Sequence, residues 1–195
     1  MKVANIKLNS TAEVKEHFAD IIFFQGCKRN CGYCFNPELK SFDGGTKMTA
    51  DDICNSLSDM SDVVVLTGGE PLIQNIVELG KLITRLKFKR KKVVVETSMY
   101  HPLIVGLADK VLYTIKTFDI NTKDLLTLRD MSNIDFCIVV GHNDFNMDGF
   151  KLAHKLIRKN IYHRFAMDIP VRFMRLYQYV KSIGKDFTVF RKIVL

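Results

Sequence analysis

Strand-length apolar runs alternate with amphipathic, helix-length stretches along most of this chain. The expected strands lie at 21–25, 62–66, 92–96, 110–115, 134–140 and 164–169, with a further extended segment at 187–194. The expected helices lie at 50–59, 74–87, 102–108, 147–159 and 171–183. Near-continuous apolar strands are typical of parallel sheets that helices cover. The alternation therefore predicts an α/β fold built on a parallel sheet.

The number of strand–helix units limits the architecture. Five or six units are too few for a closed eight-stranded barrel. We therefore expect a partial (β/α)6-type parallel barrel or an open parallel sheet. A chain of 195 residues is close to the usual size limit of one compact unit. We expect a single domain over 1–195, with a core at about 20–160 and a C-terminal part, 161–195, that completes or covers the sheet.

Hydropathy and cysteine usage indicate the compartment. The longest apolar runs, such as 63–66 and 138–140, are far shorter than the roughly 20 residues that span a membrane. The first residues lack the apolar core of a signal peptide. An odd number of cysteines, five, argues against a disulfide framework. We therefore expect a cytoplasmic protein with reduced thiols and no membrane partner.

The net charge of +8 is partly concentrated in the run Lys87–Lys92. Such a run is either a patch for nucleic acid or another polyanion, or the solvated end of a helix, where cations are favourable. The sequence favours the second interpretation, because the run falls between an expected helix and an expected strand. A nucleic-acid partner is accordingly not expected.

Three cysteines, Cys27, Cys31 and Cys34, fall within eight residues. Thiolates at this spacing can hold one metal centre within a single loop. A structural zinc site would need a fourth ligand, usually from a second paired motif, and Cys54 and Cys137 fit buried core positions better. Iron–sulfur clusters are commonly held by four thiolates. Three thiolates would leave one iron open to another molecule, which indicates a reactive site.

Polar residues and glycines follow the ends of the expected strands. These positions are Cys27, Gly68–Glu70, Glu96–Ser98, Lys116 and Gly141–Asp144. Ligands of α/β sheets lie at the carboxyl ends of the strands. We therefore expect these residues to converge on one edge of the sheet.

The motifs together resemble the radical S-adenosylmethionine (SAM) superfamily over residues 20 to about 160. The similar segments are the Cys-x3-Cys-x2-Cys loop at 27–34, a GGE motif at 67–72, a polar motif at 95–98, a "DIK" segment at 111–116 and a Gly-x-Asn-Asp turn at 139–144. The resemblance implies a [4Fe–4S] cluster on Cys27, Cys31 and Cys34, which then serve as both metal ligands and catalytic residues. It also implies that reductive cleavage of SAM yields a 5′-deoxyadenosyl radical that abstracts hydrogen.

Nine residues are expected to contact SAM. They are Tyr33, Gly68, Gly69, Glu70, Thr97, Ser98, Lys116, His142 and Asn143. Glutamate can accept from the methionyl ammonium, and lysine can pair with the carboxylate. An aromatic face can stack on adenine, and hydroxyl groups suit ribose or carboxylate. His142 and Asn143 are expected near the ribose or adenine.

Within the superfamily, the runs Phe24–Cys27 and Cys34–Leu39 are most similar to glycyl-radical-enzyme activases, especially the anaerobic ribonucleotide reductase activating proteins. This resemblance implies a glycyl-radical enzyme as partner and a reduced flavodoxin or ferredoxin as electron donor. The chain departs from that group at Asn9–Glu16, where an Asp-Gly-Pro-Gly turn is common, and at Thr114, where an aspartate is common. An aspartate there serves a monovalent cation site in some activases.

Two other functions stay open. One is a radical SAM enzyme that acts on a small molecule, like the 7-carboxy-7-deazaguanine synthases, which are also short. The other is a non-catalytic cluster or zinc module that binds nucleic acid. The last interpretation leaves the motifs after the later strands unexplained.

Overall fold

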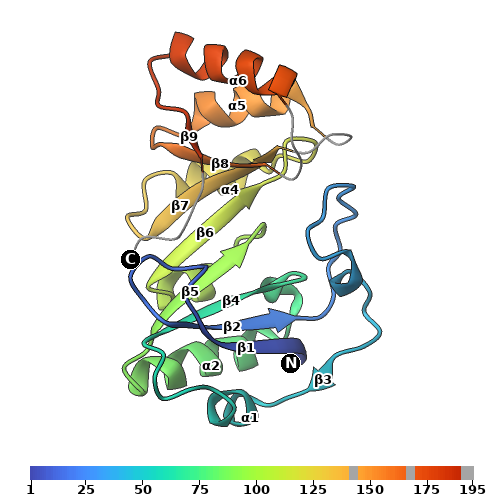
Figure 1. The fold of residues 1–195 in the computed structure, drawn as a ribbon, viewed down its shortest axis with the longest axis vertical. Coiled ribbons are helices and arrows are strands. Elements are labelled where there is room, and N and C mark those ends of the chain that lie inside the picture. The colour runs from blue at the N-terminus through green and yellow to red at the C-terminus, as the bar shows by residue number, and fades with distance from the viewer. Residues whose placement is uncertain (141–144, 166–169, 190–195) are drawn as a thin grey trace. The chain divides into compact units, whose positions relative to one another are not determined.

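The computed structural model of the chain describes residues 1–140, 145–165 and 170–189 (Figure 1). The chain divides into two compact units. Within the described ranges, unit 1 comprises residues 1–30 and 36–112, and unit 2 comprises residues 31–35 and 113–189. The expectation of one domain over 1–195 stays a prediction.

Unit 1 contains five complete strands in the order β3-β1-β2-β4-β5. They are β1 (Lys2–Ser10), β2 (Ala19–Phe24), β3 (Thr46–Lys47), β4 (Val63–Gly68) and β5 (Lys92–Thr97). The β2–β4 and β4–β5 pairs are parallel, whereas β1 pairs antiparallel with both β2 and β3. The parallel register aligns Phe24 at the end of β2 with Gly68 at the end of β4. Residues that follow these strands therefore start from the same edge.

Three α-helices and two short 3₁₀ helices complete unit 1. They are α1 (Ala50–Asn55), α2 (Ile76–Phe88), α3 (Pro102–Leu107) and the 3₁₀ helices Pro37–Leu39 and Pro71–Ile73. The α1 helix begins at Thr49, whose side chain forms a reciprocal capping box with Asp52. The α2 helix buries one face, made of Leu79, Leu82, Ile83 and Leu86. Because β4 and β5 are rich in buried valine, this face completes an apolar core around the strands.

Unit 2 contains the strands β7 (Ile134–Val140), β8 (Ile161–Phe165) and β9 (Thr188–Val189), which pair in parallel in that order. Strand β6 (Lys110–Ile115) has residues in both units. The helices are α4 (Thr122–Leu128), α5 (Met147–Leu156) and α6 (Pro170–Ser182). Phe136, Phe150 and His163 are fully buried in this unit.

The described chain is an α/β fold, and its strand order begins at β3 and ends at β9 without closing. The open-sheet alternative is therefore confirmed, and most strands were expected within two residues of their observed ends. Several expectations differ from the structure. Strand β8 begins at Ile161 instead of 164, and residues 166–169 and 190–194 of the expected extended segments lie outside the described residues. Helices α1 and α5 end at Asn55 and Leu156 instead of 59 and 159, and β1, β3 and α4 were not expected.

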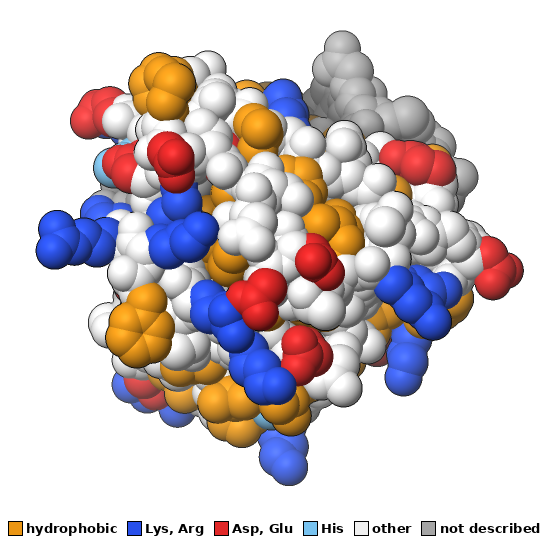
Figure 2. Space-filling model, turned by 90° about the horizontal axis from the view of Figure 1, so that it is seen from below, with side chains coloured by type: hydrophobic (Ala, Val, Ile, Leu, Met, Phe, Trp, Pro, Cys, Tyr) orange, Lys and Arg blue, Asp and Glu red, His pale blue; other side chains and the backbone are white. Residues whose placement is uncertain are grey.

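The basic run Lys87–Lys92 joins the end of α2 to the start of β5. Lys87 pairs with Asp109 at 3.0 Å, and the buried ammonium of Lys91 donates to the carbonyls of Ser58 and Ser61. On the face drawn in Figure 2, Lys and Arg side chains lie among Asp, Glu and hydrophobic side chains. The run therefore lies at a helix end and in the loop before a strand, as the second interpretation predicted, but Lys91 is buried instead of solvated.

Among the helices of the described ranges, none is both long and apolar enough to cross a membrane.

Candidate cofactor-binding site

The cysteine loop starts in unit 1, directly after β2. Gly26 has a φ of 97°, which glycine adopts easily, and its N–H donates to Leu39 O at 2.8 Å. The N–H of Cys27 donates to Lys40 O at 3.1 Å. The backbone N–H of Arg29 points at the sulfur of Cys27, with an N–S distance of 3.4 Å. Hydrogen bonds of this kind favour a thiolate, because they stabilise negative charge on sulfur.

The second part of the loop belongs to unit 2. Cys31 and Tyr33 are buried against Val139 of β7, and the half-buried Cys34 packs against the same group. The N–H of Cys34 donates to Cys31 O at 3.3 Å, which forms a tight turn between the two cysteines. The last two cysteines of the motif therefore lie at the two ends of one tight turn.

The cysteines fit a [4Fe–4S] cluster in their chemistry. None of the three is in a disulfide within the described residues, and the Cys27 sulfur already accepts a backbone N–H. Across the described ranges, no three His, Cys, Asp or Glu side chains are grouped closely enough to hold a single metal ion. The joint ligation by Cys27, Cys31 and Cys34 therefore stays a prediction.

The other two cysteines are core residues, as expected. Cys54 is buried in α1 and Cys137 in β7. Burial raises the pKa of the Cys54 thiol, although the nearby charges of Lys89 and Lys91 act in the opposite direction. A protonated, buried thiol is unreactive.

Glu70 connects the ends of β4 and β5. Its carboxylate is buried and accepts from Leu72 N–H, from the Thr97 hydroxyl, and from both the N–H and the hydroxyl of Ser98. A carboxylate can accept about four hydrogen bonds, and the Glu70 carboxylate accepts four. The expected convergence of Glu70, Thr97 and Ser98 is thus observed within unit 1.

The two glycines before Glu70 permit a close backbone approach. A Cβ on Gly69 would lie 2.1 Å from Gly26 O, and one on Gly68 would lie 2.4 Å from Phe24 N. Both distances are too short for any real Cβ atom. The glycines therefore let the GGE turn pack directly on the backbone that leads to Cys27.

Tyr33 and Lys116 meet in unit 2. The Lys116 ammonium lies 5.7 Å from the centre of the Tyr33 ring, and the Phe118 ring packs edge-on against the same tyrosine at 6.1 Å. A lysine at this distance makes a cation–π contact. Two of the residues expected to contact SAM are thus brought together, and their contact with SAM stays a prediction.

His142 and Asn143 lie outside the described residues, and so does the whole expected turn at 141–144. Their expected role near the ribose or adenine stays a prediction.

The sequence interpretation missed three contributors to the site. Arg29 donates through its guanidinium to Ser98 O at 3.3 Å, in addition to its bond to the Cys27 sulfur. Gln25 donates to Glu38 O and Ser41 O, which holds the segment after the cysteines on the end of β2. Phe118 packs on Tyr33. Arg29 carried a usable signal because it lies inside the cysteine loop, and Gln25 carried one because it belongs to the run Phe24–Cys27.

Comparison with known families decides the family. A model described as a 4Fe-4S single cluster domain matches residues 18–138, which is more than half of the chain. The chain belongs to this family. The family model implies a [4Fe–4S] cluster, and the relatives described next support the expected place in the radical SAM superfamily.

Two kinds of relative match this family member in sequence. The pyruvate formate-lyase-activating enzyme of Clostridium pasteurianum is 34% identical over 61 residues, covering 28% of this chain and 26% of the relative. The 7-carboxy-7-deazaguanine synthase of Methanopyrus kandleri is 31% identical over 118 residues, covering 48% of this chain and 47% of the relative. The chain thus matches less than half the length of either relative.

Solved structures share the fold. QueE from Escherichia coli aligns with a TM-score of 0.66 and 14% identity, covering 97% of this chain and 93% of QueE. SuiB from Streptococcus suis, crystallised with SAM, aligns with a TM-score of 0.57 and 12% identity, covering 90% of this chain and 51% of SuiB. At these identities the likeness concerns the fold.

Proposed function

We propose that this chain is a radical SAM enzyme that cleaves SAM reductively and abstracts hydrogen from a substrate. The observation that carries the proposal is the edge of unit 1. There, a backbone N–H points at the Cys27 sulfur, and Glu70 joins the polar ends of two parallel strands beside it. Such strand ends are where α/β folds bind their ligands.

The proposed roles follow the chemistry of the side chains. When bound, the cluster and SAM supply an electron and a 5′-deoxyadenosyl radical that takes a hydrogen atom. The three motif cysteines would hold the cluster as thiolates. Thr97 and Ser98, held by Glu70, would offer hydroxyl and backbone groups to the amino acid part of SAM. Tyr33 would stack on the adenine of SAM, and Lys116 would pair with its carboxylate.

The cofactor claim is tested by anaerobic reconstitution of the whole chain with iron and sulfide. Cys31→Ala is expected to abolish cluster binding, while the buried Cys54→Ala, remote from the motif, keeps it. Reduction with dithionite in the presence of SAM should release 5′-deoxyadenosine from the wild type. A wild type that holds only zinc, or that holds a full cluster and releases no 5′-deoxyadenosine, would refute the proposal.

For the substrate we propose first a glycine of an anaerobic ribonucleotide reductase-type partner, with reduced flavodoxin or ferredoxin as electron donor. The supporting observations are the run from Phe24 to Leu39 and the similarity to pyruvate formate-lyase-activating enzymes. Part of that run also has a structural role. Gln25 and Gly26 bind the carbonyls of Glu38, Leu39 and Ser41, so this run closes the cysteine loop whatever the substrate is.

A second candidate is a small-molecule enzyme of the 7-carboxy-7-deazaguanine synthase kind. The longer sequence similarity, over 118 residues, favours it. A single pair of assays separates the candidates. A glycyl radical seen by electron paramagnetic resonance on a candidate partner supports the activase, and formation of 7-carboxy-7-deazaguanine, detected by mass spectrometry, supports the synthase.

A further inference from the structure

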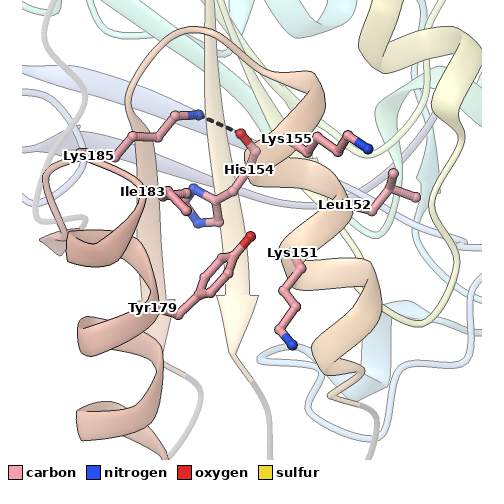
Figure 3. Close-up of a pocket in the computed structure, with 7 residues that line it drawn as sticks. All are labelled: Lys151, Leu152, His154, Lys155, Tyr179, Ile183 and Lys185. Carbon is pink, nitrogen blue, oxygen red and sulfur yellow. Dashed lines mark hydrogen bonds between the residues drawn. The ribbon is translucent and has the colours of Figure 1, made fainter.

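Helices α5 and α6 border an open pocket of about 340 Å³ in unit 2, near the lower end of the range of small-ligand sites (Figure 3). It uses none of the residues expected to bind the cluster or SAM. The rings of His154 and Tyr179, one from each helix, meet edge to face with their centres 6.3 Å apart. Lysines 151, 155 and 185 also line it, and its described lining contains no Asp or Glu.

Two hydrogen-bonded imidazoles, those of His154 and His163, determine which ring nitrogens carry hydrogen. His163 Nδ1 lies 3.1 Å from Thr188 O, and a carbonyl only accepts, so Nδ1 carries the hydrogen. The Nε2 atoms of His154 and His163 lie 3.2 Å apart. Both rings are neutral, because burial lowers the pKa of His154 to about 3 and that of His163 to about 4.

The hydrogen positions on the other three ring nitrogens follow from the number of protons on each ring. A neutral imidazole carries one N–H. Since His163 has its hydrogen on Nδ1, its Nε2 accepts, and His154 must donate from its own Nε2. His154 Nδ1 is then a bare acceptor. His154 is 2% exposed, and this nitrogen has no hydrogen-bond partner among the residues that the structure describes. A buried acceptor without a donor is unfavourable, and a ligand donor would relieve it.

The charges around the pocket indicate the rest of the ligand. Lys185 donates to His154 O and Ile157 O at the end of α5, which uses two of its three hydrogens. The exposed Lys151 holds its ammonium 5.8 Å from the centre of the Tyr179 ring. These ammonium groups favour an anion, while the Tyr179 ring and the Ile183 side chain favour a flat apolar body.

We propose that the pocket between α5 and α6 binds a small aromatic or heteroaromatic carboxylate whose ring N–H or O–H donates to His154 Nδ1. The ring lies against Tyr179, and the carboxylate pairs with Lys151, whose ammonium lies beside the Tyr179 ring. This site is separate from the cofactor site and does not depend on the proposed reaction.

Three matched probes test each part of this arrangement by calorimetry on the whole chain. Indole-2-carboxylate has the ring, the N–H and the charge. Its 1-methyl derivative lacks the donor, and indole-2-carboxamide lacks the charge. We expect saturable binding of the first, and about tenfold weaker binding of each of the others, the size of one lost buried polar contact. Equal affinities, or no saturable binding of indole-2-carboxylate, would overturn the proposal.

Variants and nuclear magnetic resonance make the test independent of folding effects. Lys151→Gln should weaken binding of indole-2-carboxylate about fivefold, while Lys123→Gln, an exposed lysine on α4 of the same unit, should leave it unchanged. Nitrogen-15 spectra of the wild type should show His154 protonated on Nε2, with the Nδ1 signal moving when the probe binds. A His154 ring protonated on Nδ1 contradicts the proposal even if the probe binds.

Discussion

Glu70 is both buried and charged, and its position in the fold explains why this is tolerated. Four hydrogen bonds from Leu72, Thr97 and Ser98 replace the water that the carboxylate loses. Two of the donors are backbone N–H groups. The glutamate therefore sets the shape of the turn after β5, in addition to any contact with SAM.

Replacing Glu70 with alanine tests this double role. Glu70→Ala leaves the N–H groups of Leu72 and Ser98 without an acceptor, at about 1–3 kcal/mol each. We expect a lower melting temperature and weaker SAM binding, with the iron content of the reconstituted protein unchanged. Glu78→Ala on α2, a partly exposed residue that pairs with Lys81 at the surface, is the control for stability. Wild-type SAM affinity in Glu70→Ala would show that the carboxylate has no role in the SAM site.

A single methyl group at Gly69 is expected to disrupt the site. In Gly69→Ala the Cβ would meet Gly26 O at 2.1 Å and Leu39 O at 2.8 Å, both of which are backbone atoms. The turn must move, at a cost of about 3 kcal/mol or more. We expect a large loss of thermal stability and poor cluster retention.

The matched control is Gly106→Ala in α3, where a Cβ would meet nothing within 4 Å. Because alanine favours a helix over glycine by about 1 kcal/mol, this variant should be as stable as the wild type or slightly more stable. Equal unfolding temperatures for the Gly69 and Gly106 variants would show that the close approach is not needed.

At the level of residues, the sequence predicted which side chains meet better than it predicted their bonds. Strand periodicity placed Glu70, Thr97 and Ser98 on one edge, since parallel strands end together. It could not predict that the Glu70 carboxylate accepts hydrogen bonds from Leu72, Thr97 and Ser98 together, because these bonds depend on the rotamer of Glu70. Arg29 was missed for a similar reason, since its partner Ser98 is distant in sequence.

Among the elements, one side chain adds to the backbone hydrogen bonds that hold the segment after the cysteines at the end of β2. Gln25 is buried and donates to Ser41 O at 2.8 Å and to Glu38 O at 3.2 Å. Gln25→Met keeps the volume but leaves both carbonyls without this donor, at about 1 kcal/mol for each bond. We expect the reconstituted variant to lose iron to a chelator faster than the wild type.

Gln178→Met, an exposed position on α6, is the control for this substitution. If both variants lose iron at the wild-type rate, Gln25 does not stabilise the cysteine loop.

Strands β1 and β8, which the sequence missed or misplaced, have weak local patterns. In β1 only Val3 and Ser10 are buried, and two register shifts interrupt its pairing with β2, so the strand shows no regular alternation. Strand β8 buries His163, a polar residue that sequence periodicity counts against a strand. Helix α4 did carry a signal. Its cap, Asn121, accepts from Asp124 N–H, a pattern typical of helix starts.

At the scale of the whole molecule, acid is expected to unfold unit 2 first. His154 and His163 are buried in this unit with pKa values of about 3 and 4, against 6.5 for an ordinary histidine. Lys151, Lys155, Lys185 and Tyr179 surround His154 and offer no negative charge to a second proton. Between these pKa values the unfolded chain binds more protons than the folded one, so stability is full above about pH 6.5 and falls as the pH drops towards 4.

Near-ultraviolet circular dichroism follows this transition, because five of the six tyrosines belong to unit 2. Each pKa unit is worth about 1.4 kcal/mol, so the loss amounts to several kcal/mol. His163→Phe should lose less stability between about pH 7 and pH 4 than the wild type. Gln178→Met, at an exposed position on α6 that titrates in neither form, should lose as much as the wild type. Identical pH profiles for all three proteins would contradict the assignment.

The hydrogen bonds to Glu70 affect how fast two backbone amide hydrogens exchange with solvent. The amide hydrogens of Leu72 and Ser98 end on the same carboxylate, although they belong to segments 26 residues apart. Neither amide can exchange with solvent deuterium until this carboxylate releases it. Their exchange rates should therefore be linked, slowing together when SAM binds and rising together whenever the strand ends separate.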